Sequence, residues 1–168
     1  MKKIVALTHH TFEDLELMYP VIRMREEKIE VVIAGLEKEV IYKGKNGYSC
    51  KSDSAFKDLR ASDYDGALIP GGFAPDKVRQ IPEVLDLIQK LHQEKKMIAF
   101  ICHGGWVPIS AKILKGRKAT GTIAIKDDLE NSGAIWVNEP VVVDGHLISS
   151  RTPTDLPFFG RAIVEFLR

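Results

Sequence analysis

The chain has 168 residues, of which 45% are hydrophobic and 28% are charged, and its formal net charge is +1. These values are ordinary for one globular domain that builds its core without disulfides or metals, so we expect a single domain over residues 1–168. A net charge this close to zero gives no reason to expect nucleic acid or an anionic membrane as a partner, and no apolar stretch is long enough for a membrane span. The two cysteines, Cys50 and Cys102, lie far apart without a Cys-x-x-Cys motif, and the N-terminus lacks signal-peptide features. We therefore expect a reducing, cytoplasmic location.

Apolar runs and turn signals predict the elements of the first half of the chain. The expected strands are residues 3–7, 30–34 and 67–70. Between the first two strands, a helix from residue 13 to about residue 27 is expected to be kinked or delayed by Pro20. Its apolar face consists of Leu15, Met18, Tyr19 and Ile22. Residues 39–52 surround an Asn46-Gly47 turn signal, which predicts a small β-hairpin.

The second half continues the alternation of helices and strands. Apolar residues at helical spacing from Ile81 to Leu91 predict an amphipathic helix, and residues 97–101 read as a strand covered on both faces. The further elements expected are strands at 118–122, 134–137, 141–143 and 147–150, a helix at 125–131, and a last helix bearing Leu156, Phe159, Ile163 and Phe166, with Thr152 or Thr154 as N-cap. This pattern predicts the α/β class, with a mostly parallel sheet, helices on both faces and a small β-hairpin.

Cys102 directly follows the buried strand and precedes a glycine pair, Gly104-Gly105, that leads into a helical segment. A strand that passes through a tight turn into a helix places the turn residue beside a helix N-terminus. Unpaired amides and the helix dipole there would move a thiol toward thiolate. This favours Cys102 as a nucleophile; the alternative is a buried structural cysteine.

In a parallel sheet the carboxyl ends of the strands meet at one crevice, which gathers Thr8–Glu13, Gly71–Asp76 and Cys102–Gly105. Glu13 would share a proton with the Cys102 thiol, unless it only begins a helix. His103 is a candidate base, although adjacent side chains in a strand point to opposite faces, and its ring could merely fill the turn.

The backbone amides of Gly71 and Gly72, with that of His103, are candidate donors to an oxyanion, or the glycines only serve the turn. Asp76 follows Pro75 as a residue in the first turn of a helix would. No metal is expected, because the spacing of His9, His10, His103, Glu13 and Cys102 matches no metal motif. His92 and His146 are expected at the surface, Cys50 is expected to be an incidental thiol, and the chain has no phosphate-binding glycine loop.

Several segments in order resemble the ThiJ/PfpI family, and more closely its PfpI-type intracellular protease branch. They are Phe12-Glu-Asp-Leu-Glu-Leu-Met-Tyr-Pro20, Leu68-Ile-Pro-Gly-Gly-Phe-Ala-Pro-Asp76, Ala99-Phe-Ile-Cys-His-Gly104, Ile125-Lys-Asp-Asp128, Val141-Val-Val-Asp-Gly145 and Ser150-Arg-Thr-Pro153. The resemblance implies a three-layer, flavodoxin-like sandwich related to class I glutamine amidotransferases. It also implies Cys102 as the nucleophile, His103 as its partner and Glu13 as the carboxylate at the sulfur.

In that branch an acidic residue of a neighbouring subunit orients the histidine, at the position matched here by Asp76, where Glu is common. The chain also departs from many relatives at Gly105-Trp106, where Pro-Gln is frequent, and at Phe73, where Arg is frequent.

The resemblance further implies a cofactor-free cysteine hydrolase, either a peptidase or a deglycase- or glyoxalase-like enzyme. Its substrate would be a peptide or a small carbonyl compound, and it would form a homo-oligomer, either a dimer or a hexamer. The alternative is a redox or stress sensor, or a chaperone, that uses oxidation of Cys102.

Overall fold

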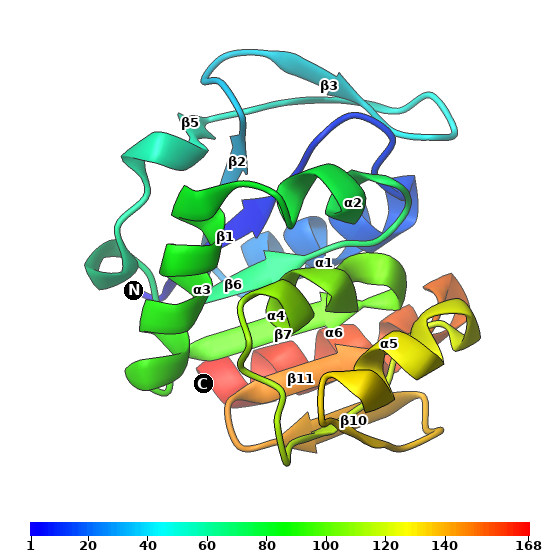
Figure 1. Cartoon of the computed structure of the whole chain (residues 1–168). Coiled ribbons are helices and arrows are strands. Elements are labelled where there is room, and N and C mark those ends of the chain that lie inside the picture. Colours follow the sequence, from blue (N-terminus) through cyan, green and yellow to red (C-terminus); the bar gives the residue numbers. More distant parts are fainter.

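A seven-stranded sheet forms the middle layer of the computed structural model, which describes residues 1–168 (Figure 1). Its strands are β1 (Lys3–Leu7), β2 (Glu30–Gly35), β5 (Ser54–Ala55), β6 (Gly66–Ile69), β7 (Met97–Ile101), β10 (Val141–Asp144) and β11 (Leu147–Ser150). Their order is β10-β11-β7-β6-β1-β2-β5, and every neighbouring pair is parallel except the β10–β11 hairpin. The predicted mostly parallel α/β sandwich is confirmed.

Helices cover both faces of this sheet (Figure 1). One face carries α1 (Asp14–Glu26) and α6 (Leu156–Leu167), and the other carries α2 (Ala74–Val78), α3 (Pro82–Gln93), α4 (Trp106–Ser110) and α5 (Lys126–Asn131). Each side has its own buried apolar cluster, of 24 residues on the α3 side and 22 on the α1 side. Strands β6 and β7 are buried along their whole length because both faces are covered, and each buried Leu, Ile or Phe contributes about 1.5–3 kcal/mol to folding.

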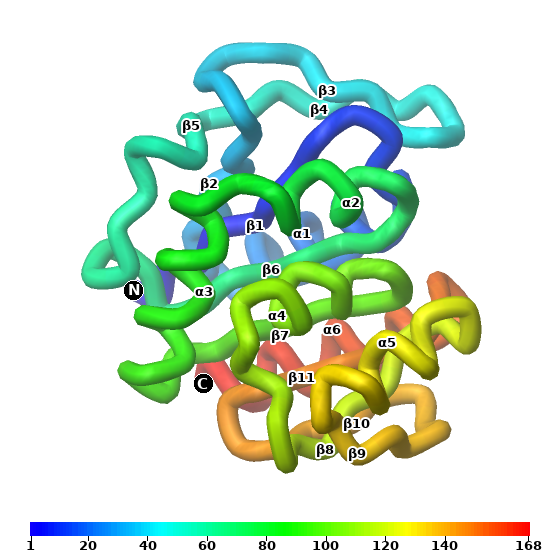
Figure 2. Tube along the Cα trace, viewed as in Figure 1, coloured from blue at the N-terminus to red at the C-terminus, as the bar shows by residue number.

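The predicted hairpin is present as β3 (Ile41–Lys43) and β4 (Ser49–Lys51), and it lies beyond the β2–β5 edge of the sheet (Figure 2). Its turn is fixed to the start of α1, because the Asp14 carboxylate accepts the backbone N–H groups of Asn46 and Tyr48 at 3.0 and 2.9 Å. A second small sheet pairs β8 (Lys118–Ala119) with β9 (Ile135–Trp136). Short 3₁₀ turns complete the fold; they are η1 (Phe56–Asp58), η2 (Ala61–Asp63), η3 (Cys102–Gly105), η4 (Ile123–Ile125) and η5 (Pro153–Asp155).

Of the apolar face predicted for α1, only Met18 packs against the buried cluster on this side of the sheet. Leu15 and Ile22 are 58% and 61% exposed, whereas Leu17, Val21 and Met24 are fully buried. Apolar residues therefore occur on both sides of this helix, and periodicity alone selected the outer set. The helix begins before Pro20 and continues past it, so the predicted delay is wrong.

Two smaller predictions also fail. His146 is buried rather than at the surface, and its Nε2 lies 2.9 Å from Nδ1 of His92. Helix α6 has Asp155 as its N-cap, and Thr152, one of the two predicted residues, is instead the N-cap of η5, which leads directly into α6. None of the helices is long and apolar enough to cross a membrane.

Candidate active site

Cys102 lies at a sharp turn where β7 ends and η3 leads into α4. Its φ angle is 58°, a left-handed conformation that side chains other than glycine adopt rarely and at some cost in strain. The turn brings Nδ1 of His103 to 3.5 Å from the Cys102 sulfur. A regular strand would send these adjacent side chains to opposite faces, so the backbone geometry is what makes the pair possible.

Two glycines let the end of β6 approach this turn. A Cβ atom on Gly104 would lie 3.2 Å from the carbonyl oxygen of Pro70 and still closer to that of Ile69. A Cβ atom on Gly71 would lie 2.9 Å from Cβ of Cys102 and 3.1 Å from the backbone nitrogen of His103. Both contacts are too close for any larger residue, so glycine is required sterically at each position.

The loop after β1 joins the same neighbourhood. The backbone N–H of Glu13 donates to the carbonyl of Gly71 at 3.0 Å, and that of Phe73 donates to Thr11 at 2.8 Å. The predicted meeting of three segments at the carboxyl edge of the sheet is therefore confirmed.

The carboxyl group beside the sulfur belongs to Glu16, and the placement of Glu13 there is wrong. Glu13 is the N-cap of α1, where its carboxylate accepts the backbone N–H of Glu16 at 2.9 Å and the amide of Asn46 at 3.3 Å. Glu16 is fully buried, and its Oε2 accepts the N–H of Gly71 at 2.7 Å. An N-cap at Glu13 turns residue 16 inward together with Leu17, a register that the capping pattern could have revealed.

Burial raises the pKa of Glu16 to about 8. Its other oxygen, Oε1, has no hydrogen-bond partner, which disfavours a carboxylate in this position. Burial also raises the pKa of Cys102 to about 12, and the charge of Glu16 adds to that increase.

The predicted lowering of the thiol pKa is therefore wrong for the resting chain, because burial outweighs the turn amides. The two acids interact strongly enough to titrate as a pair, which loses its first proton near pH 8 and holds the second to about pH 12.

His103 has one side of its ring against Cys102 and packs edge-on against Trp106, with ring centroids 5.0 Å apart. Burial lowers its pKa, and the charge of Lys45 in the hairpin turn lowers it further. Its Nε2 has no partner within the chain. Asp76 is exposed on α2, and no hydrogen bond or ion pair joins it to His103 of the same chain.

The backbone donors near the sulfur are already partly occupied. The N–H of Gly71 is bonded to Glu16, so the prediction that it faces an oxyanion is wrong. Gly72, with φ of 79°, lies opposite Phe12 in an isolated β-bridge, and its N–H donates no hydrogen bond within the chain. The N–H of His103 and the hydroxyl of Thr122 both act on the Cys102 sulfur and lower its pKa; no pattern in the sequence pointed to Thr122.

The remaining sequence candidates lie away from this cluster. His9 and His10 pack against Tyr42, with ring centroids 5.7 and 5.0 Å from the tyrosine. No group of three or more His, Cys, Asp or Glu side chains is placed to hold a metal ion. Cys50 is buried in β4, and burial raises its pKa to about 11.

Comparison with known proteins assigns this arrangement to one family. The model of the DJ-1/PfpI family matches residues 2–166. Deglycase PfpI of Pyrococcus furiosus is 45% identical over 166 residues, covering 99% of both chains, and General stress protein 18 of Bacillus subtilis is 39% identical over 168 residues, covering 99% of this chain and 98% of the relative.

Solved structures agree with the sequence relatives. A two-domain protein from Anabaena variabilis, with DJ-1/ThiJ/PfpI-like and ferritin-like domains, superposes with a TM-score of 0.97 at 40% identity. The superposition covers 99% of this chain and 48% of that protein. Drosophila melanogaster DJ-1beta superposes with a TM-score of 0.92 at 27% identity, covering 99% of this chain and 90% of that one. The chain belongs to the DJ-1/PfpI family.

Proposed function

We propose that the chain is a cysteine-dependent hydrolase of the deglycase type, which acts on a carbonyl carbon in a small carbonyl adduct. The observation that carries the proposal is the strained turn at Cys102, which presents the sulfur to a buried acid and a histidine. The family, and the name of the relative at 45% identity, support this reaction class over a purely structural cysteine.

The chemistry follows from the shared proton. When the pair carries one proton, the reactive form has a thiolate at Cys102 and the proton on Glu16. The sulfur adds to the carbonyl carbon, and the resulting oxyanion is met by the N–H of Gly72 and the proton of Glu16. For an acyl group, the bond to the departing amine or thiol then breaks and Glu16 gives its proton to that group, which leaves Glu16 as the carboxylate and the neutral His103 ready to take a proton from water in the next step. Water attacks the thioester, which releases a carboxylic acid and restores the thiol.

His103 needs a group that orients its ring, and this chain supplies none. We infer that Asp76 of a second copy faces the free Nε2, which would complete the cluster. Self-association is also supported by exposed apolar side chains on the paired helices α1 and α6, namely Leu15, Tyr19, Ile22, Phe158 and Phe166.

Asp76 and this apolar face lie on opposite sides of the sheet (Figure 1). One contact between two copies cannot use both surfaces, so their joint use would give an assembly larger than a dimer. Light scattering at micromolar concentration measures the size, and a monomer would rule out the role of Asp76 in trans.

The decisive experiment is turnover by matched cysteine variants. Purified wild type, Cys102→Ser and Cys50→Ser are assayed with methylglyoxal, its N-acetylcysteine adduct and a fluorogenic peptide. We expect wild type and Cys50→Ser to turn over the adduct and Cys102→Ser to be inactive. Activity of Cys102→Ser equal to wild type would refute the enzyme assignment, and a wild type inert toward every substrate would favour the oxidation-sensor alternative.

A further inference from the structure

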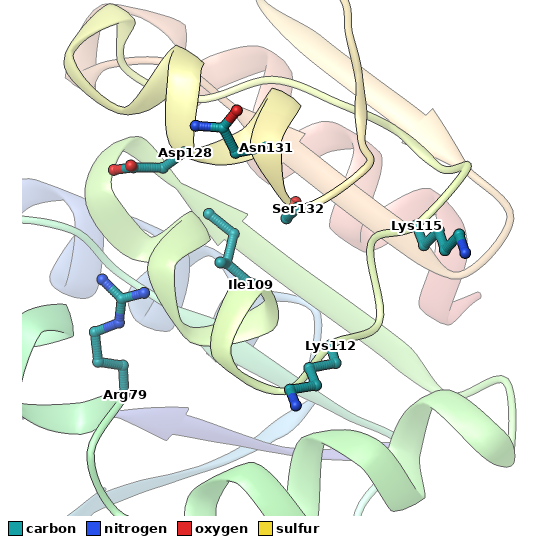
Figure 3. Close-up of a pocket in the computed structure, with 7 residues that line it drawn as sticks. All are labelled: Arg79, Ile109, Lys112, Lys115, Asp128, Asn131 and Ser132. Carbon is teal, nitrogen blue, oxygen red and sulfur yellow. The ribbon is translucent and has the colours of Figure 1, made fainter.

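The largest cavity of the chain is not at Cys102 but lies between α5 and the end of α4, with a volume of about 490 Å³ (Figure 3). It is lined by Arg79, Ile109, Lys112, Lys115, Asp128, Asn131 and Ser132. Its volume is within the range of small-molecule sites, but only Ile109 is apolar, so the lining suits a polar ligand.

Arg79 is held in place with its terminal donors unused. Its Nε donates to the hydroxyl of Ser110 at 2.9 Å, and its guanidinium carbon lies 5.3 Å from the centre of the Trp106 ring. No carboxylate of the chain pairs with it, and Figure 3 shows the guanidinium pointing toward α5. A guanidinium fixed at one nitrogen and one face is pre-organised to receive an oxyanion at the other two nitrogens.

Lys112 and Lys115, on the segment after α4, add two more positive charges to the rim. Both side chains are exposed, and neither has an ion-pair partner in the chain. Lys112 and Lys115 lie farther along the lining than Arg79 (Figure 3), so they favour an anionic ligand in general, and the two free nitrogens of Arg79 are the donors that suit a phosphate group. A phosphate monoester carries about −1.5 to −2 at neutral pH, whereas a carboxylate carries one charge.

The opposite wall is built from α5 and has a different character. Asp128 and Asn131 lie on this helix and Ser132 directly follows it; Figure 3 shows the Asp128 carboxylate on the side of Arg79 and the Asn131 amide farther from it. One oxygen of Asp128 accepts the indole N–H of Trp106 at 2.9 Å, which leaves the other oxygen as an acceptor. A carboxylate and an amide together match hydroxyl groups, which donate and accept, and the carboxylate would repel a ligand that carried only anionic groups.

We propose that this cavity is a binding site for a phosphorylated polyhydroxy small molecule, with its phosphate at Arg79 and its hydroxyl groups at Asp128 and Asn131. The site is separate from Cys102 and does not depend on the reaction proposed there. Because the Arg79 side would bind the phosphate and the α5 side would bind the hydroxyl groups, phosphate alone and the sugar alone should each bind less tightly than the ester.

Isothermal titration tests this with glucose 6-phosphate, inorganic phosphate and glucose as probes, at constant ionic strength. We expect saturable binding of glucose 6-phosphate, weaker binding of phosphate and none of glucose. Arg79→Gln should weaken the ester about tenfold or more, since it removes charge-assisted hydrogen bonds. Asn131→Ala should weaken the ester but not phosphate, and Arg161→Gln, at an exposed arginine on α6, is the matched control and should change nothing.

Circular dichroism of each variant establishes whether it is folded. If Arg79→Gln does not fold, Asn131→Ala still tests the proposal. The proposal is overturned if glucose 6-phosphate gives no saturable heat at millimolar concentration. It is equally overturned if Arg79→Gln binds the ester as Arg161→Gln does, or if phosphate binds as tightly as the ester.

Discussion

Glu16 should make the fold less stable at neutral pH than it would be with an uncharged side chain, and Glu16→Gln is the direct test. The side chain is fully buried, and its pKa rises from 4.5 to about 8 on folding. Below pH 4.5 both the folded and the unfolded chain hold the proton, so no penalty exists. As the pH rises toward 8, only the unfolded chain ionises, and the free energy of unfolding falls.

The size of the effect follows from that shift. Between pH 4.5 and 8, each pH unit lowers the free energy of unfolding by about 1.4 kcal/mol. The loss of stability is therefore on the order of 3 kcal/mol at pH 7 and approaches about 5 kcal/mol above pH 8. Glutamine keeps an oxygen for the N–H of Gly71, which Oε2 accepts at 2.7 Å, but it cannot ionise. Glu16→Gln should therefore match wild type near pH 4 and exceed it by a few kcal/mol at pH 7.5.

Urea unfolding at pH 4 and pH 7.5 measures both proteins. The difference between them isolates residue 16, because other groups that titrate in this range, such as His146, are common to both. Glu165→Gln is the matched control, since Glu165 is exposed on a helix and makes no ion pair. A stability difference that is equal at the two pH values, or a variant less stable than wild type at pH 7.5, would refute the buried-acid argument.

Three further predictions concern the same chain. The alkylation rate of Cys102 with iodoacetamide should rise with a midpoint near pH 8, and Glu16→Gln should move the midpoint above this value, because burial alone then raises the thiol pKa; an unmoved midpoint would contradict the shared proton. Gly104→Ala should lower stability by about 1–3 kcal/mol and abolish alkylation, because its Cβ meets backbone carbonyls. Gly105→Ala, whose Cβ meets only side-chain carbons at 3.1 Å or more, should be milder, and equal effects would contradict the steric argument. Burial lowers the pKa of His146 to about 4, so protonation of the unfolded chain costs wild type stability between pH 6.5 and 4; the free energy of unfolding of His146→Asn relative to wild type should rise as the pH falls over this range, and a difference that does not change with pH would contradict this.

The fold was predictable because its strands are short apolar runs with sharp ends. Residues 97–101 are apolar throughout and fully buried as β7, and the Asn46-Gly47 signal lies in the turn of the β3–β4 hairpin. The strand order was not predictable, because pairing of β7 with both β6 and β11 depends on packing between segments distant in the chain. A two-residue strand such as β5 carries no periodic signal at all.

The site was predictable as a neighbourhood but not residue by residue. Glu13, Asp14 and Glu16 all stand at the start of α1, and composition does not say which one turns inward. The answer depends on the helix register, and the apolar outer face of α1 obscured that register. Glu13 and Asp14 instead hold the hairpin turn through Asn46.

The raised thiol pKa and the strained turn at Cys102 have a common origin. The turn brings the sulfur against Glu16 by packing Gly104 beneath the end of β6, and that packing excludes the water that would otherwise stabilise a thiolate. A more open turn would give a lower pKa but would lose both the buried proton donor and the 3.5 Å approach of His103. The remaining proton of the pair therefore rests mainly on the sulfur, and a thiolate forms when that proton passes to Glu16, so that the nucleophile and the acid are formed in the same step.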